Sequence, residues 1–317
     1  MSMMLSSRWT SAAYLEAARV RTPEIDIDHL YLGLLAVGGQ AARLLGRHGV
    51  SLASARQRVR ESLSDDLATL GVHAPEAVLP PPMRAVEIGG PEWRATPRAH
   101  DLVGHAKVKE GTCAVLAALI AEPSGAARRL LAADGVDPDA LLAELAAEGP
   151  EPGAPERVPL DSGLLPAPAR AHRIGYYLSA APALVADTVA DHSTLALWAY
   201  DPARAEVTDD GATVRHSRGR KTLTVKIGQT RHREAEREVI TWTHEMLDGP
   251  HAGQPLRYDR FEVRAAPGGA ELMHTAGTRS FGRLGGLIAP LTDWFSTWGM
   301  VHGAQRLGLE VADRQAA

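Results

Sequence analysis

Apolar residues between positions 9 and 65 recur every three to four residues, which is the spacing of helices that bury one face. Thr10 is predicted to cap a short first helix, because its hydroxyl can accept a hydrogen bond from an exposed first-turn amide. Asp26 or Asp28 is predicted to open a second helix, and the Gly38-Gly39 pair to end it. Two more helices are expected before residue 65, so the segment should form a unit of four short helices.

Residues 93–148 repeat the same order of elements at a spacing of about 86 residues. Thr96-Pro97 and Gly111-Thr112 are predicted to open the first two helices of this copy, and Asp137 to cap the last one. Residues 70–92 contain three consecutive prolines and a Gly-Gly pair, so they are predicted to link the two copies. An internal duplication of this kind predicts two helical units that bury their apolar faces against each other.

The pattern changes after residues 149–169, a proline- and glycine-rich stretch that we predict to be a linker between domains. Helices are then predicted over Leu184–Trp198 and, as one long amphipathic element, over Leu287–Ala312. The predicted fold is an all-α module followed by an α+β domain, in which an antiparallel sheet wraps around the long C-terminal helix. Six segments alternate apolar and polar residues as half-buried strands do: Arg173–Ser179, Ala205–His216, Lys221–Thr230, Glu238–His244, Leu256–Ala265 and Ala270–Thr278.

Composition narrows the possible partners. The chain has 317 residues, a formal net charge of −4 and a pI near 6.4, a balance that does not favour nucleic acid. Cys113 is the only cysteine, so the chain can form neither an internal disulfide nor a thiolate metal cage, as expected of a cytoplasmic protein. The sequence shows no signal-like N-terminal segment and no apolar run long enough to span a bilayer, which predicts no membrane association.

The helical repeats resemble the N-terminal domain of Clp-type unfoldases, a double four-helix module that recruits substrates and adaptors. The first copy matches the family in Trp9-Thr10, Asp26–Leu35, Ala41–Leu45 and Gly49-Val50, and the second in Ala95–Ala99, Gly111-Thr112 and Gly135-Val136. The resemblance implies that residues 1–148 bind a peptide, a degron, a cyclic-peptide-like ligand or the Clp protease machinery. The residues that it implies for ligand contact are Thr10, Asp28, His29, Thr96 and Thr112.

In that family a glutamate of each repeat helps to bind phosphorylated arginine, and a nearby threonine helps to hold the phosphate. Asp28 keeps a carboxylate in the first copy, whereas Cys113 and Ala114 stand where the second copy would carry its acid and histidine. The resemblance therefore assigns phosphoarginine binding mainly to the first copy. The competing interpretation makes the threonines and Asp28 helix caps and makes His29 a packed or hydrogen-bonded core residue.

Residues 170–313 resemble the START-like or SRPBCC (polyketide cyclase) superfamily, whose members wrap a curved sheet around a long C-terminal helix. The resemblance rests on the order of the elements, from the first strand through Ala181-Pro182 and the Pro267-Gly268-Gly269 turn to the last helix. It implies an apolar cavity for a hydrophobic small molecule. The lining residues expected are Trp198, Tyr200, Trp242, Tyr258, Arg264, His274, Trp294 and Trp298, with His244 as a further polar candidate. The competing interpretation places the aromatic residues in a packed core and the polar ones on a solvated strand face.

Catalytic and metal signatures are missing from the sequence. It contains no Gly-x-x-x-x-Gly-Lys-Ser/Thr loop, so the Clp resemblance brings no ATPase with it, and it contains no Gly-x-Ser-x-Gly elbow. Its histidines lack the spacings of zinc sites, and we expect neither a metal nor a cofactor. The sequence thus favours a non-enzymatic binding protein that acts as an adaptor, decoy or sensor. The alternatives are a cyclase- or hydrolase-type enzyme in the C-terminal domain with the repeats as a docking module, and repeats that serve only oligomerisation.

Overall fold

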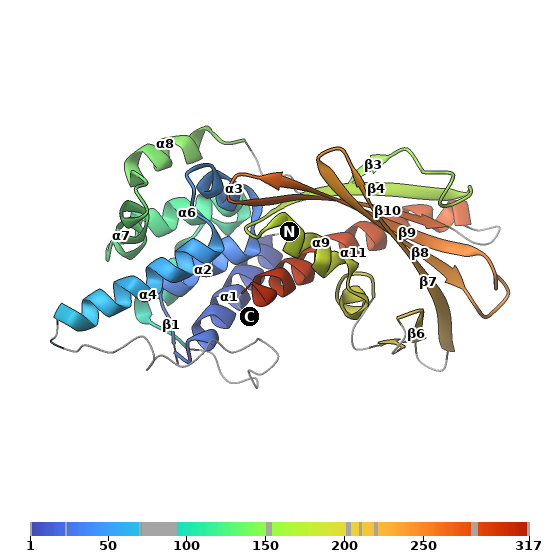
Figure 1. Cartoon of the computed structure of the whole chain (residues 1–317), viewed down its shortest axis with the longest axis horizontal. Coiled ribbons are helices and arrows are strands. Elements are labelled where there is room, and N and C mark those ends of the chain that lie inside the picture. Colours follow the sequence, from blue (N-terminus) through green and yellow to red (C-terminus); the bar gives the residue numbers. More distant parts are fainter. Residues whose placement is uncertain are drawn as a thin grey trace.

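Helices fill the first half of the chain, and an antiparallel sheet with a long last helix fills the second (Figure 1). This computed structural model describes residues 2–22, 24–69, 71, 94–149, 154–200, 204–208, 211–218, 221–279 and 285–315; of residues 2–4, 218, 221 and 285–296 it describes only the backbone. The predicted order, helical region first and α+β region second, is confirmed. None of the helices in the described ranges has both the length and the apolar character of a membrane-spanning segment.

The first helical unit has the four predicted helices, but the first one is longer than expected. Its members are α1 (Ser2–Arg19), α2 (Ile27–Val37), α3 (Gly39–Arg47) and α4 (Leu52–Thr69). No glycine or proline precedes Thr10, so the helix extends back to Ser2 and Thr10 lies in its interior. The Thr10 hydroxyl donates to the Ser6 carbonyl oxygen over 2.9 Å. The prediction that Thr10 caps this helix is therefore wrong.

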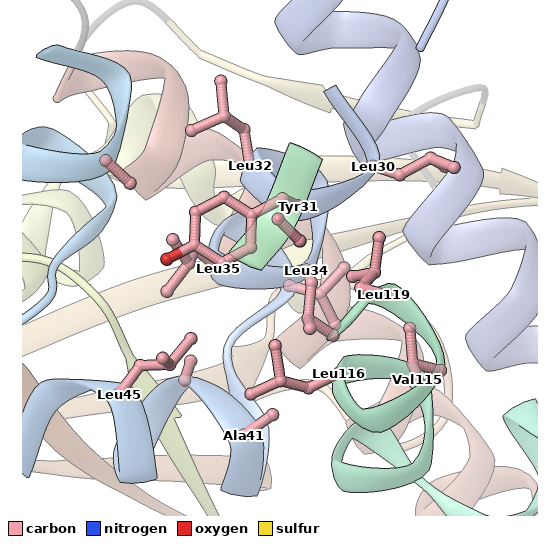
Figure 2. Close-up of a cluster of buried hydrophobic side chains, with 14 of the residues drawn as sticks. Leu30, Tyr31, Leu32, Leu34, Leu35, Ala41, Leu45, Val115, Leu116 and Leu119 are labelled. Carbon is pink, nitrogen blue, oxygen red and sulfur yellow. The ribbon is translucent and has the colours of Figure 1, made fainter. Parts of the chain in front are cut away.

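Helix α2 lies at the centre of the helical half. Every one of its residues except Asp28 is buried, so it is covered on all sides rather than along one stripe, as its nearly continuous apolar sequence allows. Figure 2 shows its leucines and Tyr31 packing against Ala41 and Leu45 of α3 and against side chains of α6 (Thr112–Ala121). Asp26 is its N-cap, and the indole Nε1 of Trp9 donates to the Leu30 carbonyl oxygen over 2.7 Å.

The second helical segment follows the predicted boundaries closely. It comprises α5 (Pro97–His105), the short 3-10 helix η3 (Val108–Glu110), α6, α7 (Ala126–Ala133) and α8 (Pro138–Ala147). Thr96 caps α5 and Asp137 caps α8, which confirms both predictions. Strands β1 (Glu24–Ile25) and β2 (Arg94–Ala95) pair in parallel between the two segments. Residues 72–93, most of the predicted linker over 70–92, lie outside the described residues.

The second half is built on one eight-stranded antiparallel sheet in the order β3-β4-β10-β9-β8-β7-β6-β5. The segment predicted as one strand over Ala205–His216 forms two, which pair as a hairpin. The predicted linker over 149–169 contains β3, which adds an edge strand to β4. The strands are β3 (Glu156–Val158), β4 (Ala169–Leu178), β5 (Ala205–Val207), β6 (Thr213–Arg218), β7 (Lys221–Glu234), β8 (Arg237–Met246), β9 (Pro255–Ala266) and β10 (Gly269–Arg279).

Helices cover one face of this sheet, which we call the inner face. They are α9 (Pro182–Ala190), the 3-10 helix η4 (His192–Thr194), α10 (Leu195–Trp198) and α11 (Gly285–Arg314). The helix predicted over Leu184–Trp198 is interrupted because Asp191 ends α9 and its side chain caps η4. The predicted long C-terminal helix is confirmed as α11. Buried side chains from α9, α10, α11 and six strands form one apolar cluster between helices and sheet.

The two halves share a core and a buried ion network. Tyr177 of β4 and Ala312 of α11 belong to the same hydrophobic cluster as the helices of the first half. Arg56 of α4 donates to both carboxylate oxygens of Glu16, over 2.8 and 2.6 Å, and to the Ala312 carbonyl oxygen over 3.0 Å. Arg19 lies 2.6 Å from the Asp313 carboxylate. The C-terminal end of α11 is therefore fixed inside the helical half, while the rest of the helix runs along the sheet (Figure 1).

Candidate functional site

Polar side chains converge on the inner face of β8, β9 and β10. In antiparallel pairs, directly opposed residues share a face, and the register pairs His244 with Arg257, Trp242 with Asp259 and His274 with Phe261. Phe261 belongs to the apolar cluster under the helices, so the residues at alternating positions, including Asp259 and Arg257, point to the same side. Tyr200, just after α10, completes the set. We call Tyr200, His244, Arg257, Asp259 and His274 the Asp259 cluster.

Asp259 is the centre of this cluster and is completely buried. Its Oδ1 accepts from Nη2 of Arg257 over 2.6 Å and lies 2.8 Å from Nε2 of His274. Arg257 also donates through Nη1 to the Ala199 carbonyl oxygen over 3.2 Å, and 23% of its side chain remains exposed. The carboxylate is thus held from two sides, and Arg257 is the member of the ion pair that reaches toward solvent.

Tyr200 and His244 extend the cluster. The Tyr200 hydroxyl lies 2.7 Å from Nδ1 of His244. The other ring nitrogen, Nε2, is 3.2 Å from Asp259 Oδ2, but neither of these two atoms makes an aligned hydrogen bond within the described residues. A neutral imidazole with its proton on Nε2 would accept from Tyr200 and direct that proton toward the carboxylate. The three groups therefore form a chain of polar atoms from Tyr200 to Asp259.

Burial and the ion pair set the protonation states. Burial alone would raise the pKa of Asp259, but Arg257, His244 and His274 together hold it well below its usual value. Burial lowers the pKa of His244 and of His274, and this effect outweighs the neighbouring carboxylate. Burial raises the pKa of the Tyr200 phenol. At neutral pH the cluster therefore contains one cation, one anion, two neutral imidazoles and a neutral phenol.

Aromatic rings surround these polar groups. Trp198 packs edge-on against Phe261 with ring centroids 4.9 Å apart, and the His274 ring stacks on Phe261 at 4.2 Å. The indole nitrogens of Trp198 and Trp242 are both satisfied, by the Thr194 hydroxyl and the Val189 carbonyl oxygen respectively, each over 3.1 Å. The inner face thus offers apolar aromatic surface next to a compact polar group.

The structure brings together five of the residues predicted for the cavity, namely Trp198, Tyr200, Trp242, His244 and His274. Three others lie elsewhere. Tyr258 alternates with Asp259 and therefore packs on the opposite face, against Leu165 and Ala171. Arg264 also faces away from the inner side and is exposed, and Trp298 of α11 is 49% exposed beside His302. The side chain of Trp294 lies outside the described residues.

Sequence reasoning missed Arg257 and Asp259, which carry the only charges in the cluster. They were missed because polar residues are expected at every second position of a half-buried strand. The signal was present in β9, where Arg257, Asp259, Phe261 and Val263 share one face while Phe261 and Val263 are clearly apolar. A charged pair on the apolar side of a strand is uncommon and points to a specific role.

The residues predicted for the Clp-type site have local structural contacts. His29 is buried and its Nδ1 accepts from the Asp26 backbone amide over 3.1 Å, as the competing interpretation expected. Thr96 donates to Asp26 over 2.9 Å while it caps α5. The Thr112 hydroxyl is buried and accepts from the Ala41 amide over 3.1 Å. Asp28 accepts from the His29 amide over 2.8 Å and keeps 36% of its side chain exposed. Of the five predicted residues, Asp28 and Thr96 are partly exposed, whereas Thr10, His29 and Thr112 are buried.

Within the described ranges, no three His, Cys, Asp or Glu side chains are arranged to hold a metal ion. In the Asp259 cluster Arg257 already neutralises the carboxylate, which makes the site unattractive to a cation.

Comparisons with known proteins give only partial structural likeness. No family model and no curated protein matches the chain. Ara h 8.0201 is 17% identical with a TM-score of 0.31, covering 45% of this chain and 99% of its own. The Mll3558 protein from Rhizobium loti is 18% identical with a TM-score of 0.28, covering 43% and 96%. Ms6760 from Mycobacterium smegmatis is 13% identical with a TM-score of 0.32, covering 49% and 96%.

Proposed function

We propose that the chain is a small-molecule-binding protein whose sheet half takes up a largely apolar ligand on its inner face. The observation that carries this proposal is the Asp259 cluster, a buried ion pair with two neutral histidines and a phenol next to Trp198 and Phe261. Apolar surface with a few convergent polar groups is the usual composition of a ligand site.

Stability alone does not account for the cluster. Burying an ion pair costs desolvation energy, and well-packed apolar residues of similar volume are often as stabilising or more so. Keeping an arginine and an aspartate among tryptophans is therefore better explained by recognition than by folding. The lowered pKa values of His244 and His274 and the strongly lowered pKa of Asp259 support the same interpretation, because such shifts gather at functional sites.

Fluorescence of N-phenylnaphthylamine tests the proposal, since this probe brightens in apolar surroundings. The full chain should bind it saturably at one site. Ala276 faces inward beside Asp259 in the register and packs with Ile174 and Met300, so Ala276→Leu should weaken binding about tenfold or more. Met273→Leu is the matched control, because Met273 lies on the same strand with its side chain exposed. Absence of saturable binding by the unmodified chain would contradict the proposal.

A second candidate function is acid–base catalysis in the same half, favoured by the 2.7 Å contact between the Tyr200 hydroxyl and His244. A phenol hydrogen-bonded to an imidazole can pass a proton to or from a bound substrate. Naphthyl acetate is a simple probe for a hydrolase of this kind. Hydrolysis faster than in buffer would support this function if Tyr200→Phe abolished it. Equal rates of hydrolysis by the unmodified chain and by Tyr200→Phe would count against it.

For residues 1–148 we propose docking of a peptide or protein partner, the role that the Clp resemblance implies. Asp28 supports this part of the proposal, because its carboxylate is partly exposed whereas Thr10 and Thr112 are engaged inside the fold. Titration of the full chain with phosphoarginine should give saturable binding that Asp28→Ala weakens. No binding at millimolar ligand would exclude the phosphoarginine version and leave protein partners to be tested by other means.

A further inference from the structure

Three buried polar atoms of the Asp259 cluster make no aligned hydrogen bond among the described residues: Arg257 Nε, Asp259 Oδ2 and His244 Nε2. The last two lie 3.2 Å from each other, and Arg257 Nε is the donor without a nearby acceptor in this set. They belong to neighbouring inward positions, because Arg257 and Asp259 alternate on β9 and His244 is paired with Arg257. A buried polar atom without a partner has lost its hydration and gained no hydrogen bond in return, which destabilises the fold. Three such atoms in one place indicate that another polar group belongs there.

Charge restricts what that group can be. The cluster already holds one cation and one anion in contact, at 2.6 Å between Arg257 Nη2 and Asp259 Oδ1. An added carboxylate would face Asp259, and an added ammonium would face Arg257, in a site where uncompensated charge is expensive. The incoming group is therefore neutral.

Hydrogen-bond direction restricts it further. The Nε–H of Arg257 can only donate, and the ionised Oδ2 of Asp259 can only accept. A neutral group that satisfies both must accept one hydrogen bond and donate another, as a hydroxyl does. The rings of Trp198, Phe261 and His274 next to the cluster suit a flat aromatic body.

Building on the proposed function, we infer that the ligand is a phenol whose hydroxyl binds at the Asp259 cluster. The hydroxyl oxygen accepts from Arg257 Nε, and the hydroxyl proton is donated to Asp259 Oδ2. A phenol is a stronger donor than an aliphatic alcohol, which suits a buried carboxylate acceptor. Arg257 and Tyr200, the partly exposed members of the cluster, lie on the solvent side of this anchor.

Calorimetric titration of the full chain with naphthol, methoxynaphthalene and naphthoate tests this inference without altering the protein. Naphthol should bind at one site and about tenfold or more tighter than methoxynaphthalene, which can accept but not donate. Naphthoate should bind most weakly, because its charge faces Asp259. In Asp259→Asn the preference for naphthol over methoxynaphthalene should shrink. Glu262→Gln is the matched control, since Glu262 lies on β9 but faces the other side and pairs with Arg237 and Arg260.

The outcomes separate the inference from the proposed function. Equal affinity for naphthol and methoxynaphthalene would overturn the phenol anchor and leave apolar binding standing. If naphthoate bound more tightly than naphthol, the Asp259 cluster would be an anion-binding site and not a site for a phenol. If neither naphthol nor N-phenylnaphthylamine binds, the three polar atoms enclose only water and both proposals fail.

Discussion

Individual side chains in the Asp259 cluster are expected to make stability depend on pH. The pKa values of His244 and His274 are lower in the folded protein than the ordinary value near 6.5. Below that value the unfolded chain binds protons that the folded chain does not, so the free energy of unfolding should fall as the pH drops from about 7.5 to about 5.5. The loss is at most about 1.4 kcal/mol per pH unit for each histidine. Asp259 does not contribute in this window, because its pKa is depressed and its stabilising effect is lost only at much lower pH.

Urea unfolding at three pH values in this window measures the effect. His274→Gln keeps a donor near Asp259 but removes one titrating ring, so its stability should vary less steeply with pH than that of the unmodified chain. His100→Gln is the control, because His100 is exposed on α5. Equal slopes for the unmodified chain and His274→Gln would show that His274 does not control this pH dependence.

Secondary-structure elements were predictable where local chemistry decides their limits. The Thr96 and Asp137 caps were correct because a hydroxyl or carboxylate before a proline-led first turn satisfies free amides directly. The prediction that Thr10 caps α1 was wrong because no residue before it interrupts the helix, which continues back to Ser2. The alternation of apolar and polar residues located the strands, and in β9 it places Asp259 on the same face as Phe261 and Val263. It could not reveal that His244 and His274 lie beside Asp259, because those neighbours depend on the register between strands, which the sequence of one strand does not fix.

The contact between α3 and β4 leads to a prediction at Gly38, the residue that joins α2 to α3. Its φ is 77°, and a Cβ there would lie 2.0 Å from the Tyr177 carbonyl oxygen. Gly49 has a similar φ of 81° but no neighbouring atom within 4 Å. Gly49→Ala should therefore cost about 1 kcal/mol of unfolding free energy through backbone conformation alone. Gly38→Ala should cost about 1–3 kcal/mol more, because the backbone of β4 must also move.

Urea denaturation of both variants provides the measurement, and Gly49→Ala gives the cost of a side chain at positive φ where no neighbouring atom is within 4 Å. If both variants lost the same amount of unfolding free energy, the helices on either side of Gly38 would have moved to make room for the Cβ, and β4 would have stayed in place.

The helical half and the sheet half share a hydrophobic cluster and a buried ion network, so we predict that they unfold as one unit. The proline- and glycine-rich stretch at 149–169 indicated a boundary between two domains; composition reports local chain stiffness and does not show which surfaces meet. The contacts that join the halves are made by residues far apart in sequence, such as Leu52 and Ser179, whose amide and hydroxyl lie 2.8 Å apart. No local pattern encodes such a pairing.

Arg56 provides the test of this coupling, because it contacts Glu16 of α1 and the Ala312 carbonyl oxygen of α11 from its own position on α4. Arg56→Ala leaves the buried Glu16 carboxylate with Arg19, 3.4 Å away, as its remaining cation, so it should lower the free energy of unfolding by about 3 kcal/mol. Arg60→Ala on the same helix should change it by less than about 0.5 kcal/mol, because Arg60 is exposed and donates a hydrogen bond to Gln57 on the surface of its own helix. Hydrogen exchange should show faster opening of the C-terminal turns of α11 in Arg56→Ala but not in Arg60→Ala.

A calorimetric scan of the unmodified chain should give one transition, because ordering α11 requires both halves. Two well-separated transitions would show instead that each half folds independently.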